Sequence, residues 1–139
     1  RTYERQGAAL GVECSDAREP GALAVARLRI REEVLSHELV HALRGALGEP
    51  GRVHVISGTS ENFCVGASAG GSIDLDTFAQ VGAAYSALCE ELRQRRDLPV
   101  VVVCHGATRG GGMLFPLAAD VVLATDDATF GFPEVRRGV

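Results

Sequence analysis

The chain has 139 residues, of which 46% are apolar and 23% are charged, and its formal net charge is −4. This composition is typical of one globular domain and excludes a disordered or fibrous chain. Because the basic residues form no run, nothing indicates binding to nucleic acid or to an anionic membrane. The longest apolar run, Leu98–Cys104, is far too short to cross a bilayer, and no signal peptide is recognisable. We therefore expect a cytoplasmic protein with no nucleic-acid or membrane partner.

The cysteines and the chain ends bear on compartment and completeness. The four cysteines are far apart and show no Cys-x-x-Cys spacing: Cys14, Cys64, Cys89 and Cys104. This pattern favours reduced, buried thiols, although an oxidised pair stays open. The chain has no initiator methionine and stops at Val139, directly after an apparent helix start. We therefore expect residues 1–139 to be one core domain that lacks its C-terminal part.

The first half of the chain combines strand and helix patterns. Leucines at positions 35, 39, 43 and 47 repeat every four residues, which is the period of an amphipathic helix that ends at Gly48. Asp16–Gly21 is rich in turn-forming residues and separates two strand-like segments. In chain order, the sequence predicts strands over Ala8–Cys14 and Leu23–Ile30, a helix over Glu32–Leu47, and a strand over Val53–Ser57.

The second half continues this alternation. The run of valines in Pro99–Cys104 predicts a strand buried on both faces, as in a parallel sheet flanked by helices. The other predicted elements are a long amphipathic helix over Asp76–Arg96, a short buried helix over Met113–Ala118, a buried strand over Val121–Ala124, and a final helical segment opened by Pro133. The order of these elements predicts an α/β fold built from βαβ units.

Two loops follow predicted parallel strands at their carboxyl ends, where ligands of α/β sheets bind. The first is the small-residue segment Gly58–Ser68, and the second is His105–Gly112. Three consecutive glycines, Gly110–Gly112, are costly before a helix unless another group must approach the bare backbone. Backbone N–H donors from two such loops could converge on one oxygen as an oxyanion hole. On its own, the glycine run is equally compatible with a tight contact between helix and strand.

Three separated segments together resemble one known family. "GTSENFCVGAS", "LPVVVVCHGATRGGGMLFPLAADVVLA" and "ATFGFPEVRRGV" are similar in order and spacing to the crotonase (enoyl-CoA hydratase/isomerase) superfamily, from about Val53 to Val139. The resemblance implies the N-terminal portion of a crotonase-like ββα spiral core that forms a trimer or a pair of trimers. It also implies an acyl thioester of coenzyme A or of an acyl carrier protein as substrate. No metal and no cofactor are expected beyond the coenzyme A or phosphopantetheine of that substrate.

The resemblance also assigns site residues. It places the two oxyanion N–H donors on Ala67 and Gly111 and a catalytic carboxylate on Glu134. The neighbouring residues expected to line the substrate are Gly66, Ser68, Gly110, Gly112, Leu114 and Arg109. For Arg109, contact with a carboxylate or phosphate of the substrate is the role considered.

One departure from the family changes the expected chemistry. Hydratases of the family carry two glutamates at the site that this chain resembles. At the position of the first glutamate this chain has Leu114, and at the position of the second it has Glu134. Activating water and protonating a carbon suits two carboxyls, whereas one carboxylate suits proton transfer in isomerisation or dehydration. The Gly-Ala-Ser at Gly66–Ser68 is also similar to decarboxylases of polyketide β-branching. Isomerase, dehydratase, hydratase, decarboxylase and a non-catalytic acyl-binding domain therefore stay open.

The remaining candidates have ordinary structural interpretations. Compression of the segment Arg29–Glu33 relative to the family favours weak coenzyme A binding or a carrier-tethered substrate. His105 is expected to bond backbone at a strand end, and His37 and His41 to lie on a solvated helix face rather than bind a metal. The arginines at positions 27, 29 and 31 are expected to face outward.

Overall fold

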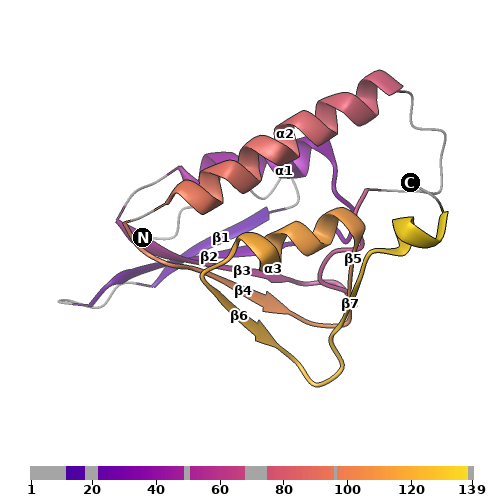
Figure 1. Ribbon diagram of the computed structural model, residues 1–139. Coiled ribbons are helices and arrows are strands. Elements are labelled where there is room, and N and C mark those ends of the chain that lie inside the picture. The colour runs from indigo at the N-terminus through magenta and orange to yellow at the C-terminus, as the bar shows by residue number, and fades with distance from the viewer. Residues whose placement is uncertain (1–11, 18–21, 49–50, 68–74, 96, 138–139) are drawn as a thin grey trace.

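The computed structural model of the chain describes residues 12–17, 22–48, 51–67, 75–95 and 97–137 (Figure 1). Its strands are β1 (Val12–Ala17), β2 (Ala24–Ile30), β3 (Arg52–Gly58), β4 (Val100–Cys104), β5 (Ala107–Arg109), β6 (Val121–Ala124) and β7 (Thr129–Gly131). Its helices are α1 (His37–Leu47), α2 (Leu75–Gln94) and α3 (Leu114–Ala118), with 3-10 helices η2 (Gly110–Met113) and η3 (Pro133–Arg137).

The strands form one five-stranded sheet and one small sheet. The large sheet has the order β1-β2-β3-β4-β6, in which only β1 pairs antiparallel with its neighbour. Helices α1, α2 and α3 connect successive parallel strands, so the predicted α/β fold with βαβ units is confirmed. The small sheet pairs β5 with β7 in parallel, at the end of the molecule where the glycine run follows β5 (Figure 1).

Helix α1 starts later than the leucine pattern predicts. The hydroxyl of Ser36 accepts a hydrogen bond of 3.1 Å from the backbone N–H of Leu39, which makes Ser36 the N-cap residue. The predicted start at Glu32 is therefore wrong by five residues. Leu35 is buried all the same, because its side chain enters the core from the segment before the cap.

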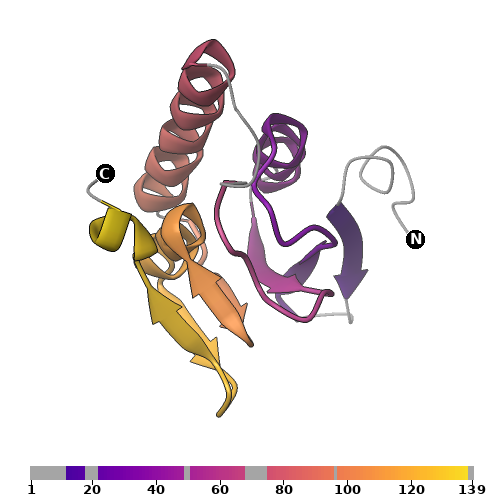
Figure 2. The same cartoon turned by 90° about the vertical axis from the view of Figure 1, so that its right-hand side faces the viewer.

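The helices pack on one side of the sheet, and the main core lies between them. α1 and α2 lie side by side over the strands (Figure 2). In β4, Val100, Val102 and Cys104 are fully buried, whereas Val101 and Val103 are half-buried. The prediction of a strand buried on both faces therefore holds fully for one face only, because α1, α2 and α3 all lie on the same side of the strand (Figure 1).

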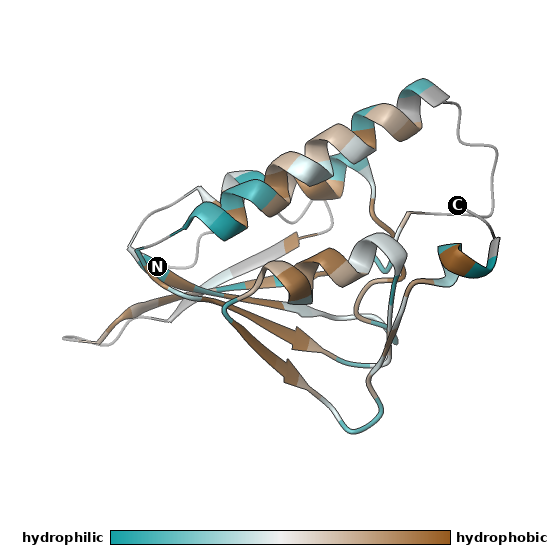
Figure 3. Cartoon of the chain, in the orientation of Figure 1, coloured by the Kyte–Doolittle hydropathy of each residue, from teal (hydrophilic) through white to brown (hydrophobic). Residues whose placement is uncertain are grey.

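Strand β6 is exposed, which corrects the prediction of a second buried strand. Its residues Val121, Val122 and Leu123 expose 46%, 42% and 54% of their surface. The reason is its place in the sheet: β6 is the edge strand and pairs with β4 alone. The hydropathy colouring shows this apolar edge (Figure 3). Leu117 in α3 is also exposed, so only part of that short helix, notably Phe115, is buried as predicted.

The remaining boundaries differ modestly. β1 extends to Ala17, so the predicted turn begins later, and residues 18–21 and 8–11 lie outside the described residues. α2 ends at Gln94, and the helical segment expected from Pro133 is the 3-10 helix η3. Arg27, Arg29 and Arg31 are exposed, as predicted.

Candidate active site

Two loops leave the carboxyl ends of the neighbouring strands β3 and β4 and then pair with each other. The N–H of Phe63 donates to the carbonyl of His105 at 3.0 Å, and the N–H of Arg109 donates to the carbonyl of Cys64 at 2.9 Å. Cys64 also forms a parallel bridge with Thr108. Because backbone bonds join the loops, the position of one determines the position of the other.

Asn62 strengthens this junction with its side chain. Its Oδ1 accepts a hydrogen bond of 2.8 Å from the N–H of Ala107 in the second loop. The carboxylate of Glu33 accepts from both the backbone N–H and the Nδ2 of Asn62, at 2.7 Å and 3.2 Å. Hydrogen bonds to a charged acceptor are stronger than neutral ones, so Glu33 holds Asn62 in place between the loops.

The glycines allow the two backbones to touch. A Cβ added to Gly66, whose φ is +85°, would lie 3.0 Å from the backbone nitrogen of Gly111 and 3.0 Å from the carbonyl oxygen of Arg109. A Cβ on Gly112 would overlap the backbone of Cys64. Both positions therefore require glycine for close approach, which supports the tight-contact interpretation of the glycine run.

That contact brings Gly66, the residue before Ala67, against the backbone nitrogen of Gly111. Ala67 follows Gly66 directly, and the carbonyl of Gly66 is occupied by the N–H of Leu35 at 3.0 Å. The glycine run itself forms η2, and the N–H of Gly111 belongs to its first turn, where the helix offers no acceptor. Within the described residues, the N–H of Ala67 likewise makes no hydrogen bond. Among the described residues, neither N–H is therefore taken by a backbone acceptor, and the role of these two groups as oxyanion donors stays a prediction.

Glu134 reaches this place from the last helix. Its carboxylate lies against the Cα of Gly110, so closely that a Cβ on residue 110 would overlap Oε1. Gly110 has φ +51°, a conformation that glycine adopts without strain. The Oε2 atom of Glu134 is buried and has no hydrogen-bond partner in the described part of the chain. The carboxylate of Glu134 therefore lies at Gly110, one residue before Gly111.

Leu114 and Tyr85 lie next to the glycine run. Leu114 is half-buried and packs against the core. The Tyr85 ring on α2 packs edge-to-face against Phe115, with ring centroids 5.9 Å apart, and its Cε1 lies 3.8 Å from a Cβ added to Gly111. The sequence pattern marks Tyr85 only as a member of the apolar stripe of a helix. Its hydroxyl group, on an otherwise apolar helix face, is the one sequence feature that could have marked Tyr85 as a candidate functional residue.

The other candidates have structural partners. The guanidinium of Arg109 donates to Thr129 Oγ1 at 2.9 Å and to the carbonyl of Thr108 at 3.2 Å, which holds β7 beside β5. The ring Nε2 of His105 lies 2.9 Å from the carbonyl of Ser60, the backbone bond that was predicted. Ser68, predicted to line the substrate, lies outside the described residues.

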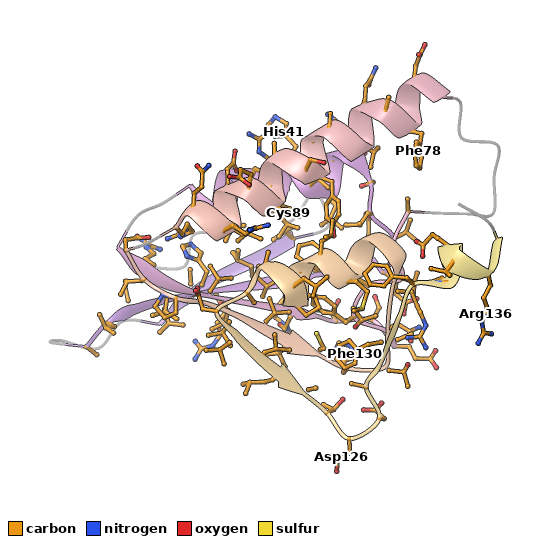
Figure 4. All side chains as sticks on the ribbon, in the orientation of Figure 1. His41, Phe78, Cys89, Asp126, Phe130 and Arg136 are labelled. Atoms are coloured by element: carbon orange, nitrogen blue, oxygen red, sulfur yellow. The ribbon has the colours of Figure 1, made fainter. Side chains whose placement is uncertain are left out.

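Two histidines and two cysteines among the candidates lie in contrasting surroundings. His37 and His41 are exposed, and His41 lies in the helix layer (Figure 4). In the part of the chain that the structure describes, no group of three or more potential ligands could hold a metal ion. Cys64 and Cys104 are fully buried free thiols, and burial raises the pKa of the Cys64 thiol to about 11. None of the helices described is long and apolar enough to span a membrane.

Comparison with known proteins gives the same family throughout. Mevalonyl-coenzyme A hydratase sidH of Aspergillus fumigatus is 35% identical over 88 residues, which are 63% of this chain and 33% of that protein. Carnitinyl-CoA dehydratase of Proteus mirabilis is 32% identical over 111 residues, or 75% of this chain and 41% of that protein. The chain therefore spans well under half of either relative.

Solved structures share the fold. The structure of an enoyl-CoA hydratase from Bacillus anthracis matches with a TM-score of 0.77 at 23% identity, over 91% of this chain and 52% of that one. The sequence profile of the enoyl-CoA hydratase/isomerase family matches residues 30–139, which include both loops and Glu134. The crotonase-like fold predicted from the sequence is thereby confirmed, and the chain belongs to the enoyl-CoA hydratase/isomerase family.

Proposed function

We propose that the protein is an enzyme of acyl thioesters that stabilises an enolate and moves a proton with a single carboxylate. The N–H groups of Ala67 and Gly111 bind the thioester oxygen, and Glu134 accepts a proton from the carbon chain. Both curated relatives compared above have names of enzymes that act on coenzyme A thioesters, one a hydratase and one a dehydratase.

The observation that carries this proposal is the position of Glu134. Its carboxylate lies against Gly110, one residue from the proposed donor Gly111, and Oε2 is buried without a partner among the described residues. A general base must lie within reach of the proton that it removes, and a proton next to a thioester carbonyl is acidic only while that carbonyl is polarised. The proposed base Glu134 contacts Gly110, and the proposed donor to the carbonyl oxygen is the next residue, Gly111.

The chemical step follows from this arrangement. Glu134 takes a proton from the carbon next to the thioester carbonyl, and the electron pair of the broken C–H bond moves into the enolate, whose oxygen the two N–H groups hold. In isomerisation, the protonated carboxyl of Glu134 returns the proton to a carbon further along the conjugated chain. In dehydration, the same carboxyl gives the proton to a departing hydroxyl at the third carbon, which leaves as water. Leu114 supplies no second carboxylate, so dehydration and its reverse, hydration, would both proceed with Glu134 alone, whereas isomerisation needs no activated water.

Exchange of thioester α-protons with solvent tests the proposal. In D₂O, the protein should exchange the α-protons of butyryl-CoA, and Glu134→Gln should slow this exchange by about 10²-fold or more, since general-base catalysis contributes at least this much. Glu32→Gln is the matched control, because Glu32 is an exposed carboxylate outside the site. Full exchange by Glu134→Gln would refute the role of Glu134.

A non-catalytic acyl-binding domain is the second candidate, favoured by Leu114 in place of a carboxylate and by the short Arg29–Glu33 segment. Thioester binding by the protein without any exchange of α-protons would establish it. The enzyme proposal, by contrast, includes three finer points. These are a substrate tethered to a carrier protein, action in polyketide β-branching including decarboxylation, and assembly into trimers. Turnover of carrier-linked against coenzyme A-linked enoyl and glutaconyl thioesters distinguishes the substrate forms.

A further inference from the structure

The segment that leads from the end of β2 to α1, residues 30–35, runs beside the first loop of the site. At its start, the N–H of Thr59 donates to the carbonyl of Ile30 at 2.9 Å. At its end, the N–H of Leu35 donates to the carbonyl of Gly66 at 3.0 Å. Because hydrogen bonds join the two backbones at both ends, the course of the first loop depends on this segment.

Glu33 lies within this segment and bonds to the loop with two different groups. Its backbone carbonyl accepts from the N–H of Val65 at 2.7 Å. One carboxylate oxygen, Oε1, accepts from both the backbone N–H and the Nδ2 of Asn62, at 2.7 Å and 3.2 Å. Glu33 therefore holds both ends of the stretch formed by residues 62–65.

Residues 62–65 are the part of the first loop that pairs with the second loop. The Oδ1 of Asn62 accepts from the N–H of Ala107, the first residue of β5, at 2.8 Å. A Cβ added to Gly106 would lie 3.0 Å from the same Oδ1, so the amide group is closely confined. A displacement of Asn62 would therefore displace β5 as well.

The two predicted oxyanion donors follow directly on this junction. Ala67 comes two residues after Val65 in the first loop. Gly111 comes two residues after Arg109, the last residue of β5. A Cβ added to Gly66 would lie 3.0 Å from the backbone nitrogen of Gly111, so the two loops are still in contact there. A shift at the junction thus changes how the segments of the two donors face each other.

We infer that Glu33 is a positioning residue of the proposed reaction and acts through Asn62 on the relative position of the two backbone donors. The group that matters is Oε1, because both hydrogen bonds to Asn62 end on it. The negative charge strengthens these bonds, and a neutral acceptor oxygen in the same place can also form them. This role rests on the proposed function, because it requires the thioester oxygen to bind at Ala67 and Gly111.

The kcat and KM for exchange of butyryl-CoA α-protons in D₂O test this role. Glu33→Ala should lower kcat by about tenfold or more, because a misplacement of about 1 Å can cost about 10²-fold. KM should change by less than about threefold, because an interaction realised in the transition state is lost. Glu33→Gln should keep kcat within about threefold of wild type, since its amide oxygen can accept both bonds. Glu32→Ala, at an exposed neighbouring carboxylate, is the control and should change neither constant.

A double-mutant cycle with Asn62 tests whether Glu33 acts through that residue. In an Asn62→Ala background, Glu33→Ala should lower kcat by less than about twofold further, since a contact that is already lost cannot be lost again. All rates are measured well below the thermal midpoint of each variant. A residue that only stabilised the fold would lower the midpoint and leave the kcat of the folded protein unchanged.

The outcomes separate this role from the proposed function. A wild-type kcat in Glu33→Ala, a loss confined to KM, or independent losses that multiply in the double variant would overturn the positioning role alone. So would a Glu33→Gln variant as slow as Glu33→Ala. If Glu33→Ala does not fold, Glu33→Asp replaces it, because its shorter side chain withdraws the carboxylate from Asn62 and should cause the same loss in kcat. A wild-type protein that exchanges no α-protons would overturn both proposals.

Discussion

The carboxylate of Glu134 lies against the Cα of Gly110, in space that any larger residue at position 110 would occupy. Gly110 also has φ +51°, which costs other L-residues about 1–2 kcal/mol. One glycine thus meets two requirements: it turns the chain into η2, and it leaves room for the proposed base beside Gly111.

Gly110→Ala should therefore lower activity more than it lowers stability. We expect α-proton exchange to fall by about 10²-fold, because the methyl group displaces the carboxylate, and the free energy of unfolding to fall by about 1–2 kcal/mol. Gly82→Ala is the control: Gly82 lies on the exposed face of α2 with open space around it. That variant should gain up to about 1 kcal/mol and keep its activity. Equal activity of the two variants would show that Glu134 needs no room at residue 110.

The junction of the two loops depends on Asn62. Asn62→Ala removes the acceptor for the Ala107 N–H and one donor to the Glu33 carboxylate. We expect unfolding to require about 1–3 kcal/mol less free energy, because part-buried groups lose their partners. Exchange activity should fall as well, since Ala67 and Gly111 lose their alignment. Urea denaturation measures the first effect, and Glu61→Ala, at the exposed neighbour, should show neither effect.

Helix α1 begins at its cap and not where the leucine pattern begins. Ser36→Ala removes the acceptor for the Leu39 N–H and should lower the free energy of unfolding by about 1 kcal/mol. Ser86→Ala, inside α2 and exposed, should change the free energy by no more than about 0.5 kcal/mol, toward higher stability. If Ser36→Ala were as stable as wild type, the helix would start nearer to Glu32, as the sequence pattern suggested.

Burial of Cys64 predicts a loss of stability in alkali. The thiol has its pKa raised from 9.0 to about 11. Below pH 9 both states hold the proton, and this thiol causes no pH dependence. From pH 9 to about 11 the unfolded chain releases the proton while the folded chain keeps it, so the free energy of unfolding falls as pH rises.

The size of this effect follows from one proton. Cys64 should contribute a slope of up to about 1.4 kcal/mol per pH unit in that window. Cys64→Ala should have a correspondingly shallower slope above pH 9 and a constant stability difference from wild type below it. Parallel curves for the two proteins over the whole range would mean that the buried thiol does not titrate as described.

The resemblance assigns the glycine run, Ala67 and Glu134 to the site from the residues of three separated segments, and these roles stay predictions. The structure brings Gly66 against Gly111, and the carboxylate of Glu134 against Gly110. The Asn62–Glu33 contact and the placement of Tyr85 beside Gly111 could not be predicted in this way. They depend on tertiary contacts between residues that are far apart in the chain, and no local pattern encodes which helix face meets which loop.

The errors in the fold prediction have a similar cause. The apolar composition of Val121–Ala124 predicts a strand correctly, but it does not say what covers that strand. In β4 four successive residues are valines, so the sequence gives no sign that only every second residue of the strand is fully buried. The start of α1 is not predicted correctly because Leu35 matches the helix period. The helix begins only after Leu35, at the N-cap residue Ser36.

The infrared stretch of a bound thioester carbonyl tests whether Ala67 and Gly111 hold the thioester oxygen as proposed. With butyryl-CoA labelled with ¹³C at the carbonyl, we expect a band at lower frequency in the complex than in water, because two N–H donors polarise the C=O bond. Glu134→Gln should retain this shift, since it affects the proton and not the oxygen. A carbonyl band of the bound thioester that stays at its position in water would refute binding of the oxygen by these two donors.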